Sequence, residues 1–146
     1  MLDDLTGKAI QTLWEEFNEA IERGTGNLIL ILLKLMGVVF WLAPEYRKNI
    51  DEFGGRYQFL SKDEEIKVSA VFCDGKLTVK EDIIQNPHVT IIFRDAKSLL
   101  NFLFSPKPDI LESLLNHNLQ TKGNLNYVYK LGYMANHLRL MMPQFG

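Results

Sequence analysis

The chain has 146 residues, of which 47% are hydrophobic and 23% are charged, and its formal net charge is −2. These values are typical of one soluble globular domain that is long enough to bury a core. The net charge gives no electrostatic footprint for nucleic acid, and the sequence has no polybasic segment of the kind that holds proteins on anionic membranes, so no nucleic-acid partner is expected.

The cysteine content and the first residues indicate the compartment. Cys73 is the only cysteine, so no disulfide can form within the chain, and a reducing compartment fits. Residues 1–5 are acidic and lack a positive region followed by an apolar run, so they do not predict a secretory signal. The expected location is the cytoplasm.

Two helices are predicted in the first third of the chain. Residues 8–23 place apolar side chains at helical spacing, with glutamates on the other side. Residues 27–43, closed by Pro44, carry Lys34 as their only charge, and sixteen helical residues would span about 24 Å, less than the roughly 30 Å of a hydrocarbon core. We expect a buried helix or one that caps the core. A helix that faces a partner or touches a membrane, and a true membrane span, are the alternatives.

Alternating apolar residues then predict a sheet. The charged residues 45–52 predict a solvated continuation of the helix over 27–43 or a connector before the two glycines that follow. Asp74 and Gly75 are a strong signal for a two-residue hairpin, because glycine adopts the positive φ that such a turn requires. The pattern as a whole indicates an antiparallel meander with one more deeply buried strand. Its predicted strands are 57–60, 66–72, 77–79 and 89–93.

The last third is predicted to be mostly helical. Asp95 is a plausible cap for a helix over 96–104, and Asn124 for the final helix over 125–142. Between them we expect a helix that begins at 108–109 and a short strand over 119–122. The economical interpretation is one α+β domain over 1–146. Its parts are an N-terminal helical extension, 1–50, and a core, 51–146.

The sequence contains no recognisable constellation of catalytic or metal-binding groups. Its histidines, His88, His117 and His137, are far apart and have no metal-ligand spacing. Cys73 has no activating base nearby in the sequence, and the glycines fit neither a dinucleotide-binding motif nor a phosphate loop. We therefore expect no catalysis, no metal and no cofactor.

The order and spacing of three segments resemble those of a known family. The hairpin at 74–79, the segment Asn86-Pro87-His88-Val89-Thr90-Ile91 and the segment 119–125 occur in the order and spacing of the sterol carrier protein family of lipid-binding domains. The likeness covers about residues 55–140. It implies a five-stranded, mostly antiparallel sheet covered by helices on one face. It also implies noncovalent binding of a sterol, fatty acid, fatty acyl-CoA or phospholipid in an apolar tunnel. Two departures are 105–109, where members often carry Gly-Lys, and the unusually apolar helix over 28–43.

The leading hypothesis is therefore an intracellular lipid-binding or lipid-transfer domain. The final helix supports it, because its apolar residues cover more than the one stripe that docking on a core requires. Methionines adapt to guests of irregular shape. The alternative is an interaction or dimerisation module that uses the helix over 28–43 or the final helix, and transient membrane contact and a homodimer stay open. The predicted tunnel-wall residues are Ile91, Phe93, Leu99, Phe102, Leu103, Phe104, Leu131, Met134, Leu138, Met141 and Met142.

Overall fold

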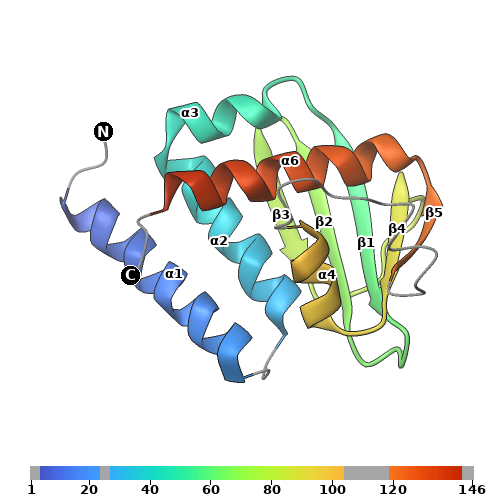
Figure 1. Cartoon of the computed structure of the whole chain (residues 1–146). Coiled ribbons are helices and arrows are strands. Elements are labelled where there is room, and N and C mark those ends of the chain that lie inside the picture. Colours follow the sequence, from blue (N-terminus) through green and yellow to red (C-terminus); the bar gives the residue numbers. More distant parts are fainter. Residues whose placement is uncertain (1–3, 24–26, 104–118, 143–146) are drawn as a thin grey trace.

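The computed structural model describes residues 4–23, 27–103 and 119–142, and it confirms the expected α+β architecture with a five-stranded sheet (Figure 1). The strands are β1 (Gly55–Ser61), β2 (Lys67–Cys73), β3 (Lys76–Lys80), β4 (Val89–Phe93) and β5 (Leu119–Gly123). The helices are α1 (Asp4–Arg23), α2 (Leu28–Leu42), α3 (Pro44–Arg47), a 3-10 turn (Lys48–Ile50), α4 (Ala96–Leu103) and α6 (Leu125–Met141). The predicted helix that begins at 108–109 lies outside the described residues.

The sheet has the strand order β3-β2-β1-β4-β5, and three of its four strand pairs are antiparallel. The exception is the central pair, because β1 and β4 run parallel. A simple meander would place β4 beside β3. Here the connection after β3 crosses over β2 and β1, and β4 lies on the far side of β1. The expectation of a mostly antiparallel sheet is therefore confirmed, but the meander is correct only for β1 to β3.

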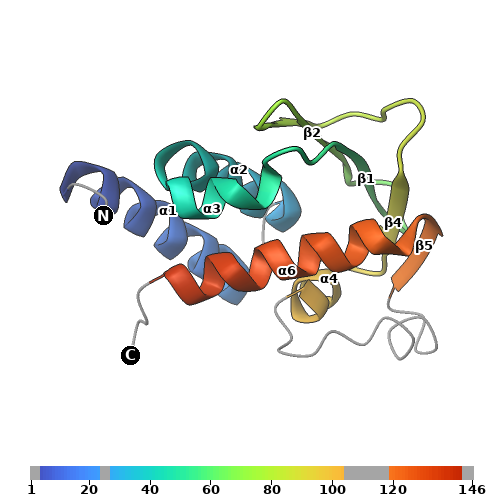
Figure 2. The same cartoon turned by 90° about the horizontal axis from the view of Figure 1, so that it is seen from above.

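The connection between β3 and β4 is held across the sheet face that the helices leave uncovered (Figure 2). The side-chain amide of Gln58 donates to the Asp82 carbonyl at 3.2 Å and accepts from the Ile84 N–H at 2.7 Å. The Arg56 guanidinium donates to the Gln85 carbonyl at 2.8 Å. These contacts attach the connection to β1 on its way to β4.

Helix α2 is the buried helix that the sequence predicts. It packs against β2 and β3 on one side and against α1 on the other (Figure 1). Among the described residues, no single helix is long and apolar enough to cross a membrane, and α2 reaches that length only together with Pro44–Ile50, from which it is bent by 109°. Its buried residues are Leu28, Ile29, Leu30, Leu32, Leu33, Leu35, Met36, Val39 and Phe40.

The segment that follows α2 is helical, over α3 and the 3-10 turn, but it is not solvated on all sides as its charges predict. Tyr46 and Ile50 are fully buried, and the Tyr46 ring stacks on Phe40 with 4.4 Å between the ring centroids. Tyr46 and Ile50 are four residues apart, so one turn of helix places both on the inner face while the charged neighbours point outward. The charged residues are the outer side of a short amphipathic helix.

The predicted hairpin turn and the two predicted helix caps are confirmed. Asp74 and Gly75 have φ values of 53° and 72°, as a type I′ hairpin requires. Asp95 Oδ1 accepts from the Ser98 N–H at 2.7 Å at the start of α4, and Asn124 Oδ1 accepts from the Asn126 N–H at 2.9 Å at the start of α6. These caps fix where the two helices leave the sheet.

Candidate functional site

The candidate site is the apolar layer between one face of the sheet and helices α2, α4 and α6. Strand residues two apart point to the same face, and the register places the inward residues of β1, β2, β4 and β5 side by side. All of them are buried. This sheet floor consists of Tyr57, Phe59, Val68, Ala70, Phe72, Val89, Ile91, Phe93 and Leu119.

The structure brings the predicted tunnel-wall residues into this layer. Ile91 and Phe93 are on the floor, and the residues predicted on α4 and α6 are buried above it. Met141 is half-buried against the same cluster, and Phe104 lies outside the described residues. That these side chains contact a lipid stays a prediction. The buried helical members are Leu99, Phe102, Leu103, Leu131, Met134 and Leu138, followed by Met142 at the end of α6.

Sequence reasoning named no wall residue on α2, although α2 supplies much of the apolar layer. Its side chains Leu32, Leu33 and Met36 are completely buried in the same cluster as the sheet floor. The sequence did indicate that α2 is buried, because the helix has a single charged residue and so cannot expose any broad face to water, but it did not indicate what α2 packs against. The site therefore has α2 as an additional wall beside α4 and α6.

Two tyrosine hydroxyls are the polar groups at the edge of this layer. Tyr46 donates to the Met134 carbonyl at 2.8 Å, and Tyr57 donates to the Tyr127 carbonyl at 2.7 Å. Burial raises the pKa of both hydroxyls far above the ordinary value, so both stay neutral donors across the physiological range. Each thus fixes α6 to its neighbour without introducing a charge.

None of the fully buried residues that the structure describes is charged. In the ranges 4–23, 27–103 and 119–142, the buried polar side chains are Gln58, Ser61 and Ser69, and all three are uncharged. The same ranges hold no cluster of three His, Cys, Asp or Glu that could bind a metal. An environment of this kind suits apolar atoms, since an unpaired charge would be strongly disfavoured there.

The histidines with described positions have structural contacts. The His88 ring stacks on Tyr127 at 4.6 Å and its Nδ1 accepts from the Arg56 N–H. The His137 Nδ1 lies 2.8 Å from the Asn49 side-chain nitrogen, which joins α6 to the 3-10 turn. His117 lies outside the described residues.

A hollow of 520 Å³ also opens to solvent beside the β2–β3 hairpin. Its lining includes the carboxylates of Asp51, Glu52 and Asp74, so it does not suit an apolar tail. The exposed thiol of Cys73 also lines it, and its described contact is with the Asp74 carboxylate at 3.6 Å. Neither feature belongs to the apolar layer.

Comparisons with known proteins give the fold a name. No model of a protein family matches the sequence, and no curated protein does. Among solved structures, the chain is similar to "UbiJ-SCP2 Ubiquinone synthesis protein", with a TM-score of 0.57 and 16% identity over 72% of this chain and 90% of that one. It is also similar to a sterol carrier protein domain of Helicoverpa armigera, with a TM-score of 0.53 and 12% identity over 77% and 89% of the two chains.

The chain has the sterol carrier protein 2 fold. A third similar structure is the sec-alkylsulfatase Pisa1 from Pseudomonas sp., with a TM-score of 0.55 and 14% identity. The match covers 80% of this chain but only 16% of the alkylsulfatase. The sterol carrier protein 2 fold therefore occurs both as most of a chain and as a small part of a much larger enzyme.

Proposed function

We propose that the chain binds a lipid without catalysis, with the apolar tail held between the sheet floor and helices α2, α4 and α6. The observation that carries the proposal is the uncharged layer between these elements in a sterol carrier protein 2 fold. Burial of an acyl chain contributes about 0.8 kcal/mol per CH₂. A sixteen-carbon tail would contribute on the order of 12 kcal/mol before ordering costs are subtracted.

The proposed ligand is a lipid, and we name the lipid classes rather than one compound. Sterols, fatty acids, fatty acyl-CoA and phospholipids all carry an apolar part that needs no charged partner in the interior. The similar structure described as a ubiquinone synthesis protein adds a quinone with an isoprenoid tail to these candidates. The proposed compartment is the cytoplasm.

The direct test is displacement of a fluorescent fatty acid by a panel that contains one lipid of each class. We expect displacement by at least one class at micromolar concentration, and native mass spectrometry of the purified protein should show bound lipid. Failure of every class to displace the probe, together with a ligand-free mass, would overturn the proposal.

A variant separates a lipid-lined space from a solid core. In a solid core, Met134→Trp should cost about 1–3 kcal/mol of unfolding free energy, because overpacking forces strained side chains. If Met134 lines a space for lipid, the lipid-free variant should keep its stability but bind less lipid. Ile10→Trp is the matched control, because Ile10 is buried on α1, which packs on α2. It should lose stability and keep its lipid capacity.

A further inference from the structure

The outer side of α6 carries an apolar stripe that the protein interior does not use. Leu125, Tyr129, Tyr133 and Leu140 have exposed fractions of 38%, 56%, 64% and 75%. The opposite side of the same helix is buried, with Leu131, Met134 and Leu138 in the core. A helix that only has to dock on a core needs a single apolar side, so the second one needs another explanation.

The exposed residues form one continuous band. At 3.6 residues per turn, the four side chains fall within an arc of about 80° around the helix axis. They extend from Leu125 to Leu140, over about 22 Å. We call these four residues the α6 stripe. Its length and narrowness suit a flat surface that meets the helix along its side.

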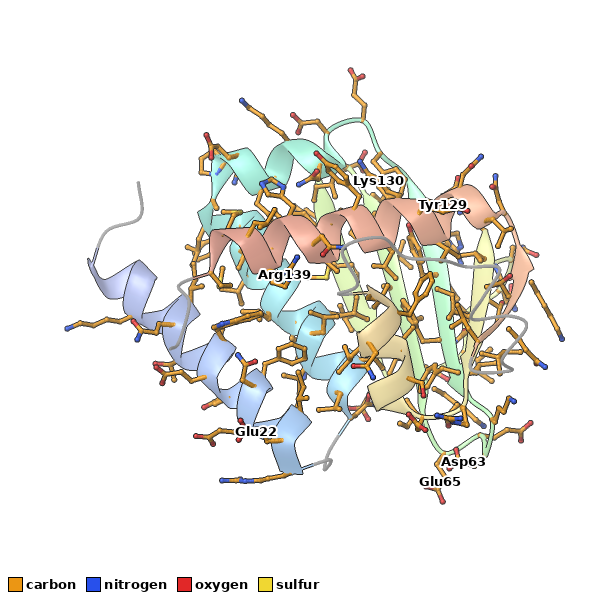
Figure 3. All side chains as sticks on the ribbon, in the orientation of Figure 1. Glu22, Asp63, Glu65, Tyr129, Lys130 and Arg139 are labelled. Carbon is orange, nitrogen blue, oxygen red and sulfur yellow. The ribbon has the colours of Figure 1, made fainter. Side chains whose placement is uncertain are left out.

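Cations border the α6 stripe on both edges. Lys130 and Arg139 lie about 100° and 80° from Tyr129 in opposite directions around the helix. Figure 3 shows them at opposite edges of α6. The Lys130 ammonium lies 5.3 Å from the centre of the Phe53 ring, and the exposed Arg139 donates to the Asn136 side chain. The aliphatic stems of both can lie along an apolar surface while their charges reach anionic groups.

The sequence segment that forms β5 and α6 differs in charge from the whole chain. From Leu119 to Met142 the sequence contains Lys122, Lys130 and Arg139 but no aspartate or glutamate, whereas the chain as a whole has a net charge of −2. Tyrosines between lysine and arginine are typical of side chains at the boundary between lipid headgroups and water. The occupant that fits this combination is an anionic lipid surface.

We propose that the α6 stripe and its two bordering cations dock the protein on an anionic membrane, with α6 lying in the plane of the headgroups. The inference adds a docking face to the proposed lipid-binding function, and it rests on the outer side of α6 alone. On its inner side α6 would contact the bound lipid, and on its outer side it would contact the membrane. The binding layer would then lie next to the membrane from which the lipid comes.

The test is flotation of the full chain with vesicles of phosphatidylcholine, pure or with 30% phosphatidylglycerol. We expect binding to the anionic vesicles, weaker binding to the neutral ones, and loss of binding in high salt because surface charges are screened. Tyr133→Ser with Leu140→Ser should lower the partition coefficient about tenfold, because less apolar area enters the interface. Arg139→Glu should lower it at least about fivefold, the factor that corresponds to about 1 kcal/mol for one cation at an anionic surface.

The matched control is Ile83→Ser. Ile83 is an exposed apolar residue of the β3–β4 connection, on the uncovered side of the sheet, and its loss should leave vesicle binding unchanged. All these positions are exposed, so the variants should fold. Equal losses in the control and the double variant, or no binding to anionic vesicles, would overturn the docking face. If the unchanged protein is a dimer and the double variant is a monomer, the α6 stripe is an interface with a second copy instead.

The two proposals fail separately. A protein that displaces fluorescent lipid but does not float with vesicles retains its lipid function and has no docking face. A protein that floats through the α6 stripe but displaces no probe has the docking face without the lipid function.

Discussion

At the scale of single residues, Asp95 links the position of α4 to pH. Its Oδ1 accepts the Ser98 N–H, and its Oδ2 lies 3.1 Å from the Arg94 guanidinium. The hydrogen bond from the Ser98 backbone, more than the Arg94 charge, holds the pKa of Asp95 below its usual range. A carboxylate with a lowered folded-state pKa stabilises the protein above its unfolded pKa of about 3.9, and this contribution is lost as the pH falls through the folded-state value.

The first prediction tests this cap. Asp95→Ala should lower the free energy of unfolding by about 1 kcal/mol at pH 7, because the Ser98 N–H loses its acceptor. Asp95→Asn should lose less, because its side-chain oxygen can still accept. Urea unfolding at pH 7 and at pH 3 measures the difference between wild type and Asp95→Ala. That difference should shrink at pH 3, and a difference independent of pH would contradict the role of the carboxylate.

At the scale of elements, the joint between β5 and α6 depends on Gly123. Its φ of 109° lies in the region that L side chains rarely adopt, and a Cβ there would overlap the His88 carbonyl. Gly123 pairs with Val89 in the sheet, and the following Asn124 N–H donates to the same His88 carbonyl at 2.9 Å. The chain passes so close to β4 that only glycine fits.

Gly123→Ala should therefore lower the free energy of unfolding by more than backbone strain alone would. We expect a loss of about 2–4 kcal/mol, the sum of a strained backbone and an overpacked contact. Gly75→Ala is the matched control, because its φ of 72° is also positive but a Cβ there meets nothing within 4 Å. That change should cost about 1–2 kcal/mol. Equal losses in urea unfolding would contradict the clash at His88.

How far the sequence predicts the fold is clear at this scale. Asp74–Gly75 specified its hairpin because the turn chemistry is local, and the helical spacing of 8–23 specified an amphipathic helix for the same reason. The parallel pairing of β4 with β1 was not predictable, because it joins strands that are distant in sequence, as do the contacts of Gln58 and Arg56 with the β3–β4 connection. Periodicity contains no information on such contacts.

The candidate site was predictable in part for a related reason. Apolar residues at 99–103 and 131–138 indicated which elements face the interior, and the structure buries them together. Composition does not distinguish a lipid-lined wall from a solid core, since both use the same side chains. It also gave no reason to place α2 over the sheet rather than against a partner, because both positions would bury it.

At the scale of the whole molecule, α1 covers the side of α2 that the sheet does not reach (Figure 1). Phe17 is completely buried, and its ring lies 5.7 Å from that of Trp14 on the same face of α1. The other side of α1 carries exposed charge, including the Glu19–Arg23 pair at 3.6 Å, which contributes little to stability. The attachment of α1 therefore depends on its apolar side.

Phe17→Ala should consequently destabilise the whole chain by about 3–5 kcal/mol, because it leaves a cavity in the seam between α1 and α2. Urea unfolding followed by circular dichroism measures the loss. Tyr129→Ala is a control of similar size at an exposed site and should change the free energy by no more than about 0.5 kcal/mol. A loss below about 1 kcal/mol for Phe17→Ala would mean that α1 contributes little to the fold.

The burial of α2 on both sides also has a consequence for how the protein is made. The ribosome releases α2 before any strand of the sheet, and β3, the later of the two strands that α2 packs against, ends roughly 40 residues after α2 does. At about 5–20 residues per second, the helix waits roughly 2–8 s for these strands. When the synthesis of α2 ends, α1 is the one described element that precedes it and can shield it. The amphipathic helix in front of α2 thus acts as a built-in cover for a nascent apolar segment.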